Sequence, residues 1–186
     1  MDSDSVVLET PRLRLRPTRP EDFEPWAGFV AYAVATRYLG GVQPRATAWR
    51  SFLTMAGAWR IQGFAMFSVI DKASGRWLGR VGPWHPEGWP GTEVGWGIVS
   101  DCWGRGYATE AATAAIDWAF AALGWSEVIH VIDVENAASQ AVARKLRARN
   151  RGRGRLPAPY EAAVVDIWGQ TRDEWRESAR HRRPVR

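Results

Sequence analysis

The sequence contains little cysteine and histidine: Cys102 and three histidines among 186 residues. A single cysteine cannot close an intrachain disulfide, and the histidines show no spacing typical of a metal site. No histidine lies near Cys102 in the sequence to activate it, so we interpret this residue as a passive thiol. The sequence therefore predicts a protein with no bound metal and no internal disulfide.

Long hydrophobic runs are also missing. The longest apolar stretch, residues 111–123, is interrupted by Thr113 and Asp117. It is shorter than the roughly 20 residues that cross a bilayer core. The chain begins with Met-Asp-Ser-Asp-Ser, which is acidic and lacks the apolar segment of a secretory signal. From these absences we expect no membrane association and a cytoplasmic location.

Apolar and aromatic residues are plentiful by contrast. They make up 46% and 12% of the chain, including 12 tryptophans, which is enough to build a packed core and excludes disorder over the whole length. The length suits one compact domain. We therefore expect a single domain over residues 1–186, with residues 176–186 as a frayed basic tail.

The net charge of +5 is concentrated in two segments. Residues 144–155 hold seven basic side chains and no acidic one, and the C-terminal tail holds further arginines. Such runs are usually solvated surfaces, and the alternative is attraction of a polyanion such as a nucleic acid or a phosphorylated cofactor. The first run lacks the interleaved aromatic residues that stack on bases, so we expect no nucleic-acid partner.

Hydrophobic periodicity predicts alternating strands and helices. The expected strands are residues 12–16, 64–70, 77–81, 92–99, 128–134 and 162–168, and the expected helices are residues 23–38, 47–60, 107–124, 136–147 and a last one from residue 171. Three strands in the middle of the chain form a meander before a β-α-β-α unit. The predicted fold class is a mixed α/β (α+β) domain.

The segment with the clearest chemical signal is Trp103-Gly-Arg-Gly-Tyr-Ala-Thr-Glu-Ala111. It follows a strand and opens an alanine-rich helix, so its glycines let the backbone approach a ligand while the first helical N–H groups point outward. Such a helix start binds anions. The alternative is a tight strand-to-helix turn with no ligand.

Five segments together resemble one known family. They are Thr92-Glu-Val-Gly-Trp-Gly-Ile-Val99, the glycine segment, Val134-Glu-Asn-Ala-Ala-Ser139, the opening Leu8-Glu-Thr-Pro-Arg-Leu-Arg-Leu-Arg16 and the ending Asp166-Ile-Trp168 with Glu174-Trp175. In this order they resemble the GNAT superfamily of acyl-CoA N-acyltransferases, especially the ribosomal-protein N-terminal acetyltransferase (RimJ/RimL-like) branch. The resemblance covers nearly the whole chain.

The resemblance implies a mostly antiparallel central sheet, flanked by helices and splayed at the cofactor site. It also implies acetyl-CoA as cosubstrate, without a metal, and a primary amine as acceptor. The pyrophosphate would lie on Trp103, Gly104, Arg105, Gly106, Tyr107 and Ala108. The pantetheine arm would lie along the strand at Ile98, and Asn136 would stand near the cofactor or serve only as a helix N-cap.

The resemblance also suggests the catalytic groups. An ammonium group cannot attack a thioester, and Glu93 matches a strand glutamate that would remove its proton. Ser139 matches the position that would protonate the departing thiolate, and backbone N–H groups near Ile98 would bind the oxyanion. Glu93 could instead be an exposed carboxylate at a strand end. An alternative function is a catalytically silent sensor that binds coenzyme A, and we expect a monomer or homodimer.

One segment departs from the family pattern. Relatives carry Lys-Leu-Gly-Phe after the second helix of this unit, whereas this chain has Lys145-Leu-Arg-Ala148. Without that glycine, the end of the helix is expected to move toward Asn150 or Gly152. Trp84, Trp89 and Trp96 cluster around the strand before the glycine segment, where they pack in the core or line the acceptor site.

Overall fold

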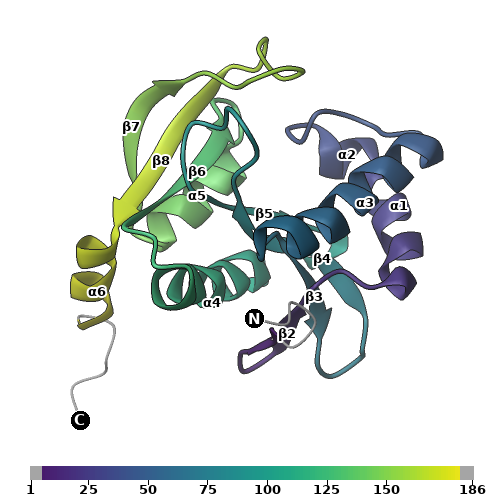
Figure 1. Ribbon diagram of the computed structural model, residues 1–186, viewed down its shortest axis with the longest axis horizontal. Coiled ribbons are helices and arrows are strands. Elements are labelled where there is room, and N and C mark those ends of the chain that lie inside the picture. The colour runs from purple at the N-terminus through teal and green to yellow at the C-terminus, as the bar shows by residue number, and fades with distance from the viewer. Residues whose placement is uncertain (1–5, 181–186) are drawn as a thin grey trace.

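A computed structural model describes residues 6–180, and these form one mixed sheet with helices on both sides (Figure 1). The sheet has eight strands in the order β1-β2-β3-β4-β5-β6-β8-β7. The strands are β1 (Leu8–Glu9), β2 (Leu13–Arg16), β3 (Phe67–Asp71), β4 (Trp77–Trp84), β5 (Glu93–Ile98), β6 (Glu127–Asp133), β7 (Arg149–Gly154) and β8 (Val165–Thr171). The α-helices are α1 (Phe23–Ala31), α2 (Ala33–Thr36), α3 (Arg45–Gln62), α4 (Tyr107–Ala122), α5 (Ala137–Lys145) and α6 (Arg172–Arg180).

The sheet divides into two antiparallel parts that meet at β5 and β6. These two strands run parallel and share a single register pair, Glu93 with Ile129. All other neighbouring strands are antiparallel. Beyond Glu93 the two strands have no further paired residues, so the sheet is splayed there. The expected fold class, a mostly antiparallel sheet flanked by helices and open at one place, is confirmed.

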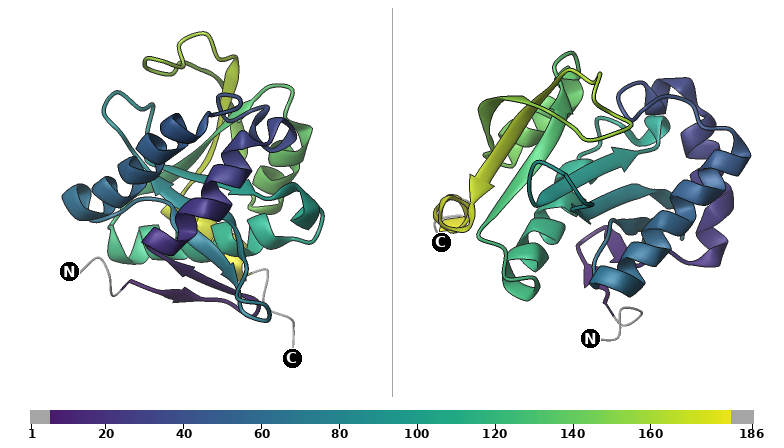
Figure 2. Two further views of the ribbon diagram at one scale, coloured as in Figure 1. Left: turned by 90° about the vertical axis from the view of Figure 1, so that its right-hand side faces the viewer. Right: turned by 45° about the horizontal axis from the view of Figure 1, so that its top comes forward.

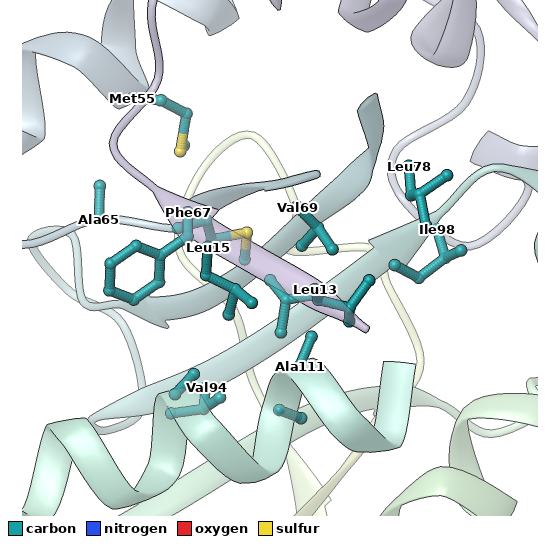
Figure 3. Close-up of a cluster of buried hydrophobic side chains, with 14 of the residues drawn as sticks. Leu13, Leu15, Met55, Ala65, Phe67, Val69, Leu78, Val94, Ile98 and Ala111 are labelled. Atoms are coloured by element: carbon teal, nitrogen blue, oxygen red, sulfur yellow. The ribbon is translucent and has the colours of Figure 1, made fainter. Parts of the chain in front are cut away.

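Small residues hold helix α4 close to the sheet. Ala111, Ala112 and Ala115 are fully buried, and their short side chains allow the helix backbone to approach the strands. Figure 3 shows Val94 on β5 beside this helix, within a cluster that also contains Leu13 and other apolar side chains of β2 to β5. Helices α1 and α3 lie beside β4 and β5, away from β7 and β8 (Figure 2, right).

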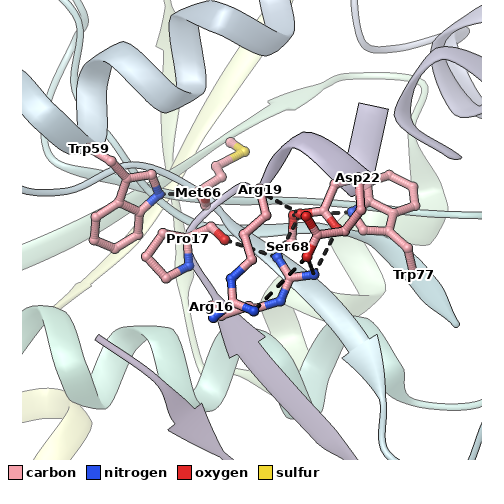
Figure 4. A network of polar contacts seen from close by, with 9 residues as sticks. Arg16, Pro17, Arg19, Asp22, Trp59, Met66, Ser68 and Trp77 are labelled. Atoms are coloured by element: carbon pink, nitrogen blue, oxygen red, sulfur yellow. Dashed lines mark hydrogen bonds and ion pairs between the residues drawn. The ribbon is translucent and has the colours of Figure 1, made fainter. Parts of the chain in front are cut away.

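A buried ion pair connects β2 to the start of helix α1 (Figure 4). The guanidinium of Arg16 donates two hydrogen bonds to Asp22, from Nη1 to Oδ2 at 2.7 Å and from Nη2 to Oδ1 at 2.8 Å. The hydroxyl of Ser68 on β3 also donates to Asp22 Oδ2, and Trp77 Nε1 donates to that hydroxyl. Both charges are buried and both are satisfied, which fixes the chain entering α1 against the sheet.

The structure differs from the expected elements in several places. The helix expected over residues 23–38 is interrupted at Tyr32, whose extended backbone separates α1 from α2. The short strand β1 was not expected, nor was β7, which the basic run 144–155 concealed. Helix α6 reaches Arg180, and residues 181–186 of the expected frayed tail lie outside the described residues.

The end of helix α5 corrects a specific expectation. The helix does not continue toward Asn150 or Gly152 but ends at Lys145, and Arg147 adopts the left-handed conformation at φ 66°. The N–H of Ala148 donates to the carbonyl of Ala143, and that of Arg147 donates to Arg144, which is the hydrogen-bond pattern of a Schellman cap. Pairing of β7 with β8 fixes the chain directly after this turn, so an arginine occupies a conformation that favours glycine.

The arginines of β7 have carboxylate partners. Arg151 pairs with Glu127 at 2.5 Å, Arg153 lies 3.5 Å from Asp166, and Arg149 lies 3.6 Å from Glu174. This strand is at the edge of the sheet, where charged side chains discourage pairing with another chain. The pairing supports the solvated-surface interpretation of the run. Within residues 6–180, no helix has the length and apolar character that crossing a membrane requires.

Candidate active site

A cavity of about 560 Å³ opens where the sheet is splayed. Its walls come from the chain around α2 and α3, from β4, β5 and β6, and from the loop between β7 and β8. Glu93, Asn136 and Ser139, three residues that the sequence indicated, all line it. The size lies in the range of small-molecule sites.

Glu93 is the first residue of β5 and is buried, with 6% of its surface exposed. Its carboxylate accepts hydrogen bonds from Trp89 Nε1 at 2.6 Å and from the Val131 N–H at 3.2 Å. Burial raises the pKa of Glu93 to about 7, although these hydrogen bonds and the charge of Arg80 oppose the rise. The alternative of an exposed strand-end carboxylate is therefore wrong. A carboxyl group with this pKa can take up and release a proton near neutral pH.

Ser139 and Asn136 lie at the start of helix α5, on the other side of the splay. The side chain of Asn136 accepts a hydrogen bond from the Ser139 N–H at 3.0 Å, which is an N-cap, and both residues line the cavity. The hydroxyl of Ser139 accepts a hydrogen bond from Trp96 Nε1 at 3.2 Å. Because the indole can only donate, the hydroxyl proton of Ser139 remains available to another acceptor.

His130 on β6 also lines the cavity, and the sequence did not indicate it. Its Nδ1 lies 2.7 Å from the carbonyl of Val94, which can only accept, so Nδ1 carries the proton. Burial lowers the pKa of His130 to about 4, so the ring is neutral at neutral pH. The ring of Trp96 packs on it with centroids 4.9 Å apart. His130 therefore holds β6 against β5 and supports the indole that reaches Ser139.

The glycine segment forms an exposed loop before helix α4. Gly104 and Gly106 both have positive φ, 74° and 81°, and Gly106 is the N-cap of the helix. The first backbone hydrogen bond of α4 runs from the Glu110 N–H to Gly106, so the N–H groups of residues 107–109 are not used inside the helix. This arrangement suits a negatively charged group.

Arg12 of the strand β2 region holds this loop in place. Its guanidinium donates to the carbonyl of Arg105 at 3.0 Å and to Glu110 at 2.7 Å, and it lies 4.3 Å from the centroid of the Tyr107 ring. A Cβ at Gly106 would lie 3.5 Å from the Arg12 side chain. Arg12 lies directly before β2 and thus fixes the loop from a position 93 residues before Arg105 in the chain. The sequence showed Arg12 only as part of the N-terminal resemblance.

Ile98 connects the loop to the splayed strand. The N–H of Val99, the residue directly after β5, donates to the carbonyl of Leu78 on β4, so the backbone groups of Ile98 point to the opposite side. The carbonyl of Ile98 accepts a hydrogen bond from Trp103 Nε1 at 2.7 Å. The N–H of Ile98 faces the same opening between β5 and β6.

The structure thus separates the indicated residues into two groups. Glu93, Asn136 and Ser139 share the cavity, whereas the described loop residues 103–108 do not line it. Arg80, Trp84, Trp89 and Trp96 also line the cavity, so the tryptophan cluster does contribute to it. Among residues 6–180 no cluster of three His, Cys, Asp or Glu side chains is arranged to hold a metal ion.

Comparison with protein families identifies a domain over most of the chain. Residues 12–149 match the family described as the acetyltransferase (GNAT) domain. The uncharacterized N-acetyltransferase YoaA of Bacillus subtilis is 25% identical over 170 residues, which cover 87% of this chain and 96% of that protein. A shorter match, 35% identical over 86 residues, covers 45% of this chain and about half the length of the uncharacterized protein YkkB of the same organism.

Comparison with solved structures gives matches over most of the chain. An acetyltransferase from Agrobacterium tumefaciens is 27% identical, with a TM-score of 0.78, and the match covers 90% of this chain and 95% of that one. Mycobacterium smegmatis RimJ, solved in complex with CoA-disulfide, is 22% identical with a TM-score of 0.69. That match covers 95% of this chain and 91% of the RimJ chain, and at this identity it concerns the fold.

Proposed function

The chain belongs to the acetyltransferase (GNAT) family, and we propose that it transfers the acetyl group of acetyl-CoA to a primary amine by direct attack of the amine on the thioester. The family is one of acetyltransferases, so the chain is an enzyme, and its structural neighbours include RimJ. The observation that supports the proposed mechanism best is the position of Glu93. It is a buried carboxyl group with a pKa of about 7, in a cavity where the sheet is splayed.

Glu93 acts as the general base. Its carboxylate takes one proton from the acceptor ammonium, which leaves a lone pair on nitrogen to attack the thioester carbonyl. A group with a pKa near the working pH is ionised often enough to accept the proton and binds it well enough to drive the transfer. The hydrogen bonds from Trp89 and Val131 keep the carboxylate oriented between proton transfers.

Ser139 protonates the leaving group. As the C–S bond breaks, the electron pair goes to sulfur. The Ser139 hydroxyl donates its proton to the resulting thiolate and takes up the second proton of the acetylated nitrogen, so the serine ends neutral and the product is an amide. The hydrogen bond from Trp96 directs the hydroxyl proton away from the indole, which suits this role. The N–H of Ile98 on the splayed side of β5 would bind the carbonyl oxygen as negative charge develops there.

The loop of residues 103–108 binds the pyrophosphate of acetyl-CoA. The positive φ angles of Gly104 and Gly106, the N–H groups at the start of α4 and the exposed Arg105 suit a polyanion. The pantetheine arm then follows β5 toward the cavity. The indole of Trp103 donates a hydrogen bond to the Ile98 carbonyl, so it lies beside the proposed path.

Two glycine variants test the cofactor loop. We expect Gly106→Glu to abolish acetyl-CoA binding, measured by calorimetry, because the side chain strains the backbone, contacts Arg12 and repels the pyrophosphate. Gly124→Glu is the matched control, since Gly124 lies after the other end of α4, has φ 69° and has open space around its Cβ position. Equal affinities in the two variants would overturn the loop assignment.

A thiol-release assay tests the transfer itself. Acetyl-CoA is supplied with amines, amino acids, aminoglycosides or short peptides, and thiol is expected only with a suitable acceptor. Ser139→Ala should then slow release by a few-fold, because a thiolate leaves tolerably well without a proton. Ser74→Ala, in an exposed turn, is the control. Binding of coenzyme A without turnover on any amine would instead favour the silent sensor, which no observation here supports.

A further inference from the structure

Arg80 is a cation inside the cavity without a carboxylate in contact with it, although the charge of Glu93 acts on it from a greater distance. It lies on β4 and lines the cavity, and burial lowers its pKa from the usual value. Among residues 6–180 it has no carboxylate within 4.0 Å, and its contact is with the ring of Trp26, 4.9 Å from the guanidinium. An arginine stays charged even when buried.

The rest of the fold treats a buried arginine differently. Arg16 is more deeply buried than the half-buried Arg80, and both of its outer nitrogens donate to the carboxylate of Asp22. Removing a guanidinium from water without such a partner is unfavourable, and the cation–π contact with Trp26 replaces only part of its hydration. Arg80 therefore has donor groups for which residues 6–180 provide no hydrogen-bond acceptor.

The register places Arg80 and Glu93 on one face of the sheet. On the paired strands β4 and β5, Arg80 is opposite Gly97 and Trp84 is opposite Glu93. Four residues along a strand correspond to roughly 13 Å between Cα atoms, and both side chains extend into the space between. Glu93 leans toward this space, since its Oε1 lies 3.2 Å from the position of a Cβ at Gly95. The cavity thus has a carboxylate at one end and a cation at the other.

We propose that Arg80 binds a carboxylate of the acceptor, so that the acceptor is an amine that also carries a carboxylate group. The proposal rests on the proposed function for the amine end of the cavity, where Glu93 takes the proton. The planar guanidinium matches a carboxylate with two parallel hydrogen bonds. The acceptor would lie between the two charges, with its amine at Glu93.

The charges around the cavity favour a single negative charge over a phosphate. Arg37 also lines the cavity, but it is exposed and lies 3.7 Å from Glu135, so its charge is already shared. One guanidinium that no carboxylate of the described residues contacts can bind an acceptor carboxylate, whereas a dianion would call for a second cation or several N–H donors. Trp84, Trp89 and Tyr160 add apolar surface to the same cavity for the rest of the acceptor.

The test compares acceptors that differ only in the carboxylate. Glycine, phenylalanine and 4-aminobutanoate are each paired with the corresponding carboxamide, so that the spacing between amine and carboxylate also varies. Binding is measured by calorimetry in the presence of coenzyme A, and transfer by thiol release. We expect wild type to bind at least one carboxylate about 10- to 100-fold more tightly than its amide, the range of a charge-assisted hydrogen bond.

The variants locate that preference. Arg80→Met and Arg80→Gln should both reduce the preference for the carboxylate over the amide to less than about threefold. Two different substitutions are used in case one of them disturbs folding. Arg50→Met, an exposed position on α3, removes the same charge and should keep the preference. The proposal would be overturned if wild type bound every acid and its amide with equal affinity. It would also be overturned if the preference for the carboxylate persisted in both Arg80 variants.

The two readouts separate this proposal from the proposed function. A carboxylate preference in binding that depends on Arg80, without thiol release for any acceptor, would support the anion site and contradict acetyl transfer to these amines. Thiol release that is equal for acids and amides would support the transfer and contradict the anion site.

Discussion

Replacement of Glu93 by glutamine should change both the rate and its pH dependence. Near neutral pH the loss in kcat/KM should be about 100-fold or more, the usual scale for a general base. In wild type kcat/KM should rise with pH up to about 7, where Glu93 becomes ionised, and then level off until the acceptor amine itself loses its proton. For the variant, kcat/KM should show no inflection at pH 7 and should keep rising with pH up to the pKa of the amine.

The loss in Glu93→Gln should therefore shrink by about tenfold for each pH unit between 7 and the pKa of the amine. An alkylamine with a pKa near ~10 gives the widest window for this measurement. A wild-type profile without an inflection near 7, or a variant with wild-type rates at every pH, would show that another group removes the proton.

The raised pKa of Glu93 also has a consequence for stability. The difference between 4.5 and about 7 corresponds to roughly 3 kcal/mol at ~1.4 kcal/mol per pH unit. Because the folded state binds this proton more tightly than the unfolded state, the contribution of Glu93 to the free energy of unfolding should fall as pH rises from about 4.5 to about 7. Glu93→Gln should lack this fall. His130, whose pKa is lowered to about 4, contributes a rise with pH below 6.5 in wild type and variant alike, so the effect of Glu93 is the difference between the two proteins. Urea denaturation of both proteins at pH 5 and pH 8 measures it, and equal pH dependence in the two would contradict burial of an ionisable group at this position.

Three further predictions, two of them with a control variant, test other parts of the structure. Arg147→Gly should raise the free energy of unfolding by about 1 kcal/mol because it relieves the left-handed backbone, whereas Arg144→Gly inside helix α5 should lower it by a similar amount, both by denaturant titration. Asp22→Ala should cost about 3–5 kcal/mol because it leaves the guanidinium of a buried arginine unpaired, while Glu24→Ala at an exposed ion pair should change little in the same titration. Trp89→Phe removes a hydrogen bond to the ionised carboxylate and should move the inflection of the kcat/KM profile to a pH above 7, and an unchanged inflection would contradict this contact.

The local patterns in the sequence predicted most helices and strands, and long-range contacts explain where the prediction failed. We expected the end of α5 to be displaced because the family's glycine is missing. Pairing of β7 with β8 instead imposes the turn, and Arg147 adopts the left-handed conformation despite its side chain. Strand β7 was concealed because its alternating arginines carry no apolar signal. Their partners, such as Glu127 and Asp166, come from β6 and β8 and are visible only in the fold.

The candidate site shows the same division. Short motifs identified the loop before α4 and the N-cap Asn136, because turns and caps depend on neighbouring residues. Burial of Glu93, and with it the raised pKa, depends on β6 and on the loop that carries Trp89, so one strand could not reveal it. Arg80 gave no signal at all, since an arginine on a strand appears as an exposed charge until its surroundings are known.

The most direct test of direct acetyl transfer is the stoichiometry of a single incubation. Wild type and Cys102→Ser are mixed with acetyl-CoA, with and without acceptor, and mass spectrometry counts free coenzyme A, N-acetylated acceptor and acetylated protein. Cys102 is buried and free, so it serves as the control nucleophile. We expect one acetylated amine for each coenzyme A released by both proteins, and no acetyl group on the protein when the acceptor is omitted. Acetylated protein without acceptor, or coenzyme A released without an acetylated amine, would contradict direct transfer.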